Sequence, residues 1–353
     1  MAADLSQAIQ AQVREASARK IPLAIRGGGS KQFYGRETTG EILALDGHRG
    51  IVNYQPTELV LTARAGTPLV EIEALLAEHG QFLPFEPPHF GPGATLGGAI
   101  ASGLSGPRRP YTGSARDFVL GVTMLNGRGE ILRFGGEVMK NVAGFDIARL
   151  MAGALGTLGV LLEISLKVLP RPVIEETLVF DYDPACAISE ANRWAGQPLP
   201  LAGAVHDGER LYLRLSGSVA GVRAAQARLG GEPVADGAAF WRAIREQQHD
   251  FFAGDTPLWR LSVPPAAPLL DLPGRWLIDW GGAQRWLRTE LPAASVQDAA
   301  RRAGGHASGF RGGERRGEVF QPLPPALAAL HRRLKSAFDP DGILNPGRLY
   351  ADF

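Results

Sequence analysis

The sequence predicts an α+β protein of two domains, and three observations support this prediction. The chain has 353 residues, more than one hydrophobic core usually serves. Its first half carries two glycine-rich segments, at residues 26–31 and 91–113, among strand and helix patterns. After residue 172 these segments stop, and strands and helices follow in the order βαββα, which is typical of helices beside an antiparallel sheet.

In the first half, hydrophobic patterns predict helices over residues 4–19, 69–78 and 145–155, and strands over 21–25, 59–65, 118–125, 130–134 and 160–169. Thr67 as N-cap and Pro68 at the first helical position are typical of a helix start. The turn Asn126-Gly127 predicts that the strands on either side of it form a hairpin. The break Pro170-Arg171-Pro172 predicts a domain boundary.

In the second half, the pattern predicts strands over residues 174–180, 201–206, 210–216, 257–263 and 275–280, a short segment over 285–289, and helices over 184–195, 219–229, 238–250, 294–303 and 325–338. The strand segments are expected to form one antiparallel sheet.

Composition excludes several classes of protein. A net charge of +1 gives no general attraction to nucleic acid or to anionic membranes. The single cysteine, Cys186, excludes an intramolecular disulfide and any multi-cysteine iron–sulfur or zinc cluster within this chain. The arginine-rich stretch 301–316 has one aromatic residue, Phe310, and includes Glu314, so it is expected to be a solvated loop or a partner contact and not a nucleic-acid site. With no secretory signal and no transmembrane segment, we expect a cytoplasmic protein.

The first glycine-rich segment follows a predicted strand and has the composition of an anion site. Gly27, Gly28 and Gly29 can adopt positive φ, and their N–H groups can converge on an anion. Lys31 adds a positive charge beside them. With the second segment, this predicts a long phosphorylated cofactor lying against bare backbone. Ordinary tight turns are the alternative.

The common nucleotide motifs do not fit these glycines. The P-loop pattern is not present near Gly27. The dinucleotide fingerprint G-x-G-x-x-G requires glycine where the chain has Gln32 or Leu96. A phosphate site therefore does not imply a Rossmann fold here.

An ordered series of motifs resembles the FAD-binding half of the vanillyl-alcohol oxidase-type flavoproteins, the PCMH-type FAD-binding family. The motifs are Ile25–Lys31, Pro92–Gly98, Gly113–Asp117, Lys140–Asp146, Gly156–Gly159 and the tail Phe338–Arg348. In the second half, three motifs resemble the FAD-binding E subunits of bacterial glycolate oxidase complexes: Leu258–Pro264, Leu277–Gly282 and Gly304–Ala307.

The resemblance implies a PCMH-type FAD-binding domain of two subdomains over residues 1–172. It implies an α+β cap domain over 173–320, and a C-terminal helix and tail over 321–353 that return to the FAD domain. The residues it implies for FAD binding are Gly27, Gly28, Gly29, Ser30, Lys31, Pro92, Gly93, Thr95, Gly97, Gly98, Ser105, Gly106, Gly113, Ser114, Gly159, Val160 and Asn345. Asp117 is expected to bond the loop backbone instead.

Two departures from the family pattern shape the expected chemistry. Some relatives attach FAD through a histidine in the first loop, but here Ser30 and Lys31 follow the glycines, so noncovalent FAD is expected. Related 2-hydroxy-acid dehydrogenases hold a metal with a histidine pair and a carboxylate. The seven histidines of this chain show no such spacing, so no metal site is expected.

The resemblance leaves two functions open. In one, the chain is an FAD subunit that works beside a D-type flavin subunit and an F-type iron–sulfur subunit, in the cytoplasm or at the periphery of the inner membrane through the complex. In the other, it oxidises glycolate or a similar small 2-hydroxy acid by itself. The catalytic candidates are then Arg260, to bind the carboxylate, and His306, as general base.

Overall fold

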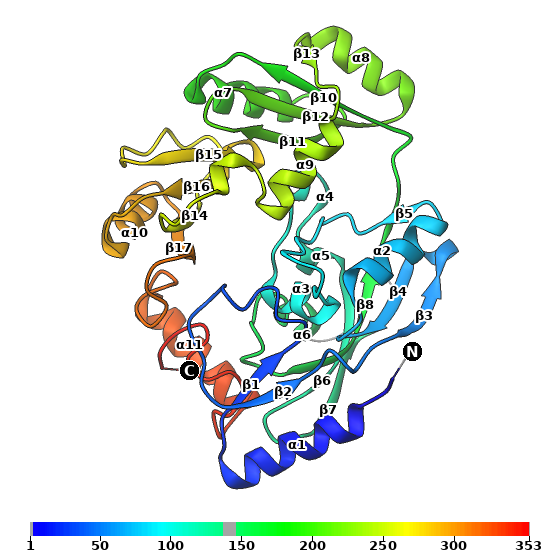
Figure 1. Cartoon of the computed structure of the whole chain (residues 1–353), viewed down its shortest axis with the longest axis vertical. Helices are drawn as coiled ribbons and strands as arrows, with labels where there is room; N and C mark the ends of the chain where they lie inside the picture. The colour runs from blue at the N-terminus through cyan, green and yellow to red at the C-terminus, as the bar shows by residue number, and fades with distance from the viewer. Residues whose placement is uncertain (1–2, 137–145, 353) are drawn as a thin grey trace.

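The first half of the chain is organised by a five-stranded antiparallel sheet with the strand order β3-β4-β8-β6-β7 (Figure 1). The computed structural model describes residues 3–136 and 146–352. The elements of this half are α1 (Ser6–Arg19), β1 (Leu23–Arg26), β2 (Glu41–Ala44), β3 (Ile51–Gln55), β4 (Val60–Arg64), α2 (Leu69–Glu78), β5 (Gln81–Phe82), α3 (Leu96–Ser102), α4 (Arg109–Thr112), α5 (Ala115–Phe118), β6 (Val119–Leu125), β7 (Ile131–Gly135), α6 (Ile147–Leu150), β8 (Val160–Lys167) and β9 (Leu169–Pro170).

Helices α2 and α3 pack against this sheet through apolar side chains. Leu69, Ile72 and Leu76 recur at helical spacing along α2, and all three are fully buried. They share one core with sheet residues such as Ile164 and Leu166 on β8. A separate parallel pair, β1 and β2, lies beside α1, and β1 leads directly into the first glycine-rich segment.

The second half forms an eight-stranded antiparallel sheet with the order β13-β10-β12-β11-β15-β16-β14-β17. Figure 1 shows it above and to the left of the first half. Its elements are β10 (Ile174–Phe180), α7 (Pro184–Ala195), β11 (Leu201–His206), β12 (Leu211–Gly217), α8 (Val219–Leu229), β13 (Glu232–Pro233), α9 (Gly237–Glu246), β14 (Leu258–Ser262), β15 (Arg275–Asp279), β16 (Gln284–Arg288), α10 (Ala293–Arg302), β17 (His306–Arg311) and α11 (Pro325–Phe338). The predicted α+β class and antiparallel sheet are confirmed.

A buried ion-pair cluster joins the two halves. Glu86, from the loop after β5, accepts two hydrogen bonds of 2.8 Å from Arg214 on β12. Arg108 donates to the same carboxylate from its backbone N–H and its side chain, and also pairs with Glu175 on β10. Each buried charge therefore has an opposite charge within bonding distance, which its burial requires.

Local details of the prediction need correction. The helix expected over 145–155 is limited, in its described part, to Ile147–Leu150, because Gly153, Leu155 and Gly156 all have positive φ. Thr67 is not the N-cap of α2. Pro68 has that position, and the hydroxyl oxygen of Thr67 accepts a hydrogen bond from the N–H of Gly50. Residues 140–145 of the Lys140–Asp146 motif lie outside the described residues.

Candidate functional site

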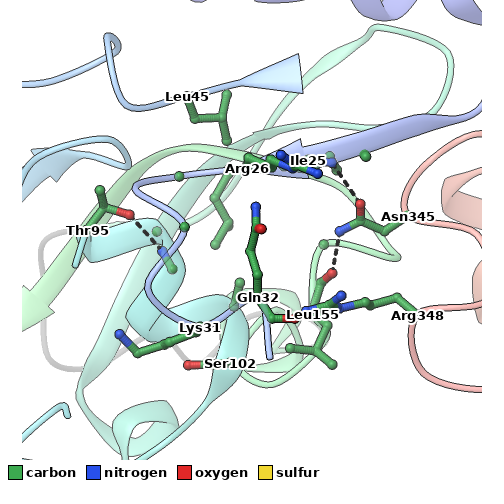
Figure 2. Close-up of a pocket in the computed structure, with 18 of the residues that line it drawn as sticks. Ile25, Arg26, Lys31, Gln32, Leu45, Thr95, Ser102, Leu155, Asn345 and Arg348 are labelled. Atoms are coloured by element: carbon green, nitrogen blue, oxygen red, sulfur yellow. Dashed lines mark hydrogen bonds between the residues drawn. The ribbon is translucent and has the colours of Figure 1, made fainter. Parts of the chain in front are cut away.

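A cavity of about 320 Å³ opens where β1 ends, next to α3 and the loop before β8 (Figure 2). That volume lies at the low end of the range for small-molecule sites. Segments far apart in sequence supply its walls. The lining residues are Ala24–Gln32, Glu37, Thr38, Leu45, Ala65, Thr95, Gly97, Gly98, Ala101, Ser102, Met151, Ala154–Gly156, Gly159, Leu161, Arg315, Asn345 and Arg348.

The first glycine-rich segment forms one wall, and close contacts explain two of its glycines. A Cβ at Gly28 would lie 1.6 Å from the carbonyl oxygen of Gly93, and a Cβ at Gly27 would lie 2.5 Å from the Thr95 hydroxyl. Only Gly29 of the three has positive φ, at +80°. Glycine is therefore required at 27 and 28 because two loops touch, and at 29 because of backbone conformation.

The sequence predicts a loop for the second glycine-rich segment. In the structure, part of that segment is helical instead. Thr95 caps α3 by accepting a hydrogen bond from the N–H of Gly98 at 3.2 Å, so Gly97 and Gly98 lie in the first turn of a helix. A Cβ at Gly97 would meet Ala65 at 2.8 Å. The glycines let this helix pack closely on the end of β4. Because they have no side chains, the backbone of the first helical turn faces the cavity directly.

Positive side chains surround the cavity. Among the described residues that line it are four cations, Arg26, Lys31, Arg315 and Arg348, and one carboxylate, that of Glu37. Burial lowers the pKa of Lys31 to about 8, although Glu246 partly offsets this. Burial and the neighbouring charges of Arg315 and Arg26 lower the pKa of Arg348 to about 10. Both side chains are cationic at neutral pH, so the cavity favours an anionic ligand.

The C-terminal tail closes the cavity opposite the glycines. The side-chain amide of Asn345 accepts a hydrogen bond from the N–H of Ile25 at 2.8 Å and donates to the carbonyl of Leu155 at 2.7 Å (Figure 2). Leu23 and Leu344 form a β-bridge beside it. Asn345 thus lines the cavity and also ties together the two loops that flank it.

Ten of the predicted cofactor residues line this cavity: Gly27, Gly28, Gly29, Ser30, Lys31, Thr95, Gly97, Gly98, Gly159 and Asn345. The other seven do not line it: Pro92, Gly93, Ser105, Gly106, Gly113, Ser114 and Val160.

Several of those seven residues have local structural contacts. The hydroxyl oxygen of Ser105 accepts a hydrogen bond from the N–H of Ala115, and the N–H and hydroxyl of Ser114 both donate to Asp117. Asp117 therefore bonds loop backbone, as expected. Val160, the first residue of β8, is fully buried in the core that also includes α1.

Arg260 and His306 lie on the neighbouring strands β14 and β17, away from this cavity. Arg260 lines a second, smaller cavity between the two halves. The His306 side chain is exposed at the start of its strand, where partial enclosure and the charge of Arg260 lower its pKa. The sequence placed His306 after a glycine turn and did not reveal β17.

Arg315 and Arg348 were missed as lining residues. Arg315 belongs to the arginine-rich stretch, where its side chain donates to the carbonyls of Gly35 and Gln32. Arg348 donates to the carbonyls of Arg36, Gln32 and Tyr34. These bonds hold the loop that follows the first glycines. The tail motif itself was the available signal for Arg348, whereas Arg315 offered none.

Comparisons with known proteins agree with this geometry. Residues 2–135 match the family model "FAD binding domain", and residues 283–349 match "FAD linked oxidases, C-terminal domain". The chain is 53% identical over 349 residues to glycolate oxidase subunit GlcE of Escherichia coli (strain K12), covering 99% of this chain and 98% of that protein. The chain belongs to the GlcE family of glycolate oxidase subunits.

More distant relatives share parts of the chain or its fold. Glycolate oxidase subunit GlcD of Bacillus subtilis (strain 168) is 31% identical over 169 residues, which cover 47% of this chain and 36% of GlcD. The structure of p-cresol methylhydroxylase with substrate bound superposes with a TM-score of 0.74 at 16% identity, covering 100% of this chain and 88% of that one. Alkyldihydroxyacetonephosphate synthase gives 0.66 at 15% identity, covering 96% and 74%. These two likenesses show the fold alone.

Membership of this family makes the chain an FAD-linked oxidoreductase with an FAD binding domain. Within residues 3–136 and 146–352, no group of three or more His, Cys, Asp or Glu side chains is arranged to hold a metal ion. No helix in those ranges is long and apolar enough to cross a membrane.

Proposed function

We propose that this chain is the FAD-carrying subunit of a complex that oxidises glycolate to glyoxylate, and that FAD lies in the large cavity. The observation that carries the proposal is the cavity itself, where a glycine cradle, a bare helix start and four cations meet. A dianionic pyrophosphate favours several backbone donors, little steric bulk and positive charge. Gly27–Lys31 and Thr95–Gly98 would hold that group.

The apolar part of the cavity suits the flat ring systems of the cofactor. Leu45, Ala154, Leu155 and Leu161 line it together with Gly159. When bound, flavin accepts a hydride from a carbon that carries a hydroxyl group, and the protein supplies binding, orientation and electrostatics. In this chain the loops held by Arg315 and Arg348 would orient the cofactor by fixing the wall after Gly29.

We propose that the attachment is noncovalent. Among the described residues that line the cavity, none is histidine, cysteine or tyrosine, and Ser30 and Lys31 follow the glycines. Purified holoprotein is precipitated with acid, and the flavin absorbance of supernatant and pellet is compared. Yellow colour in the supernatant supports the proposal. Colour that stays with the pellet contradicts noncovalent attachment, and purified protein that does not take up added FAD contradicts the cofactor.

The family relation also suggests partners. GlcE and GlcD are named as separate subunits of glycolate oxidase, so we propose that this chain works beside a D-type flavin subunit. An F-type iron–sulfur subunit would carry electrons onward, in the cytoplasm or at the inner membrane surface. Co-purification from the native source, followed by flavin and iron analysis, tests this assembly. A chain that purifies alone and is rapidly reduced by glycolate under anaerobic conditions would favour a stand-alone dehydrogenase.

A further inference from the structure

Two arginines from opposite halves of the chain meet at one tryptophan. Trp280 follows β15 and donates from its ring N–H to the carbonyl of Gly106, across the boundary between the halves, at 3.0 Å. The guanidinium carbon of Arg109, on α4, lies 4.3 Å from the Trp280 ring centroid. That of Arg260, on β14, lies 5.3 Å from the same centroid. Both distances are within the range of a cation–π contact.

Neither arginine is neutralised by a carboxylate. Among the described residues, no ion pair involves Arg109 or Arg260, and Asp117 acts on Arg109 only through its more distant charge. Two buried arginines elsewhere have direct partners for their terminal nitrogens. Arg214 pairs with Glu86, and the guanidinium of Arg288 donates to three backbone carbonyls. In the described part of the chain, the charges of Arg109 and Arg260 at Trp280 have no ion-pair partner, and an anionic ligand would supply one.

The sheet holds Arg260 in a fixed position with part of its guanidinium free. Its Nε donates to Oε1 of Gln284 at 2.6 Å, and Nε2 of Gln284 donates to the buried carboxyl group of Asp279 at 3.1 Å. No hydrogen bond of the two terminal nitrogens of Arg260 is found among the described residues. Those two nitrogens form the fork that suits a carboxylate.

A small cavity with a mixed polar and apolar lining adjoins Arg260. Its volume is about 20 Å³, room for about one water-sized group. Gln247 lines it, is 92% buried, and has a side-chain oxygen without a hydrogen-bond partner. A buried acceptor of this kind costs free energy unless a donor reaches it. A hydroxyl group entering the cavity would supply that donor.

We infer that Arg260 and Arg109 bind the carboxylate of a small 2-hydroxy acid, whose hydroxyl group enters the cavity and donates to Gln247. The inference rests on the proposed function and deepens it, because it gives this subunit an acid-binding site of its own. The small cavity has room for the hydroxyl group of glycolate and little room for anything larger.

Isothermal titration calorimetry of the FAD-loaded chain with glycolate, and separately with acetate, tests this site. The variants are Arg260→Gln, Arg109→Gln and Gln247→Leu, with Arg260→Lys as a second, milder change of the same residue. Arg275→Gln is the matched control, since Arg275 also stacks on an aromatic ring of the cap, Phe251, at 5.8 Å. FAD content is measured for every variant.

We expect Arg260→Gln and Arg109→Gln each to weaken glycolate binding at least tenfold, which is about 1.4 kcal/mol. Arg260→Lys should weaken it less, and Arg275→Gln should leave it unchanged. Gln247→Leu should weaken glycolate binding but not acetate binding. The inference is overturned if the FAD-loaded parent does not bind glycolate, if Arg260→Gln binds it as the parent does, or if the arginine variants lose FAD instead. If the parent protein itself does not bind FAD, that result contradicts the proposed function.

Discussion

Replacing Gly28 with alanine should weaken FAD binding by forcing two loops apart. The added Cβ would start 1.6 Å from the carbonyl oxygen of Gly93, and real Cβ atoms essentially never approach closer than 3.0 Å. The obstacle is backbone, so no side-chain rotation relieves it. Overpacking of this kind costs about 1–3 kcal/mol. If the loops relax by parting at the cavity, FAD affinity falls roughly 5- to 150-fold.

The measurement is a titration of apoprotein with FAD, followed by quenching of flavin fluorescence. Circular dichroism and the unfolding temperature show whether the variant has folded. Gly136→Ala is the control, because a Cβ there meets nothing within 4 Å and lies at the end of the β6–β7 hairpin. An alanine at 28 that leaves both FAD affinity and unfolding temperature at parental values would refute the contact argument and the assignment of this loop.

Three further outcomes follow from the ionisable groups. In a denaturant titration, Glu86→Gln should lower the free energy of unfolding by about 3–5 kcal/mol, because it leaves buried arginine charge unpaired. Glu175→Gln, at a more exposed position, should lower it clearly less. The lowered pKa of Glu86, about 2, means that its contribution is present above pH 4.5 and is lost as the pH falls toward 2. Burial raises the pKa of Asp279 to about 7, so stability should decline as the pH rises from about 4 to 7, and Asp279→Asn should abolish that decline in unfolding temperature. Because the pKa of Lys31 is about 8, FAD affinity should fall as the pH rises past 8, and Lys31→Met should remove this dependence in the fluorescence titration.

The sequence was sufficient to predict features that depend only on residues close together in the chain. The Asn126-Gly127 turn forces a tight reversal, and the hairpin β6–β7 forms with Met124 opposite Leu132. The glycines after β1 line the cavity. This placement could be predicted because a glycine-rich segment directly after a strand is a common form of anion site. These features need no information about the rest of the chain.

The sequence was insufficient to predict features that depend on contacts between residues far apart in the chain. Gly28 needs to be glycine because of Gly93, and no local pattern shows that contact. The meeting of Arg109 and Arg260 at Trp280 depends on how the two halves dock. The start of α3 was obscured because Gly97 and Gly98 lower helix propensity, while close packing on Ala65 and capping by Thr95 override it.

The C-terminal tail is fixed to a loop that lines the main cavity. Lys335, buried on α11, donates to the carbonyls of Thr157 and Leu344 at 2.8 Å and to the carboxylate of Asp339 at 2.6 Å. Every donor of this buried cation is used, so the tail is fixed against the loop before β8.

That loop and the tail both line the cavity, through Leu155 and Asn345. A ligand that binds only when both are in place stabilises their docking by mass action. Because such coupling is reciprocal, FAD bound at the proposed site would strengthen docking of the tail by the same factor by which docking strengthens FAD binding. The segment matched as the C-terminal domain of FAD linked oxidases therefore contributes Asn345 to the cavity, although Asn345 lies more than 300 residues from the first glycines.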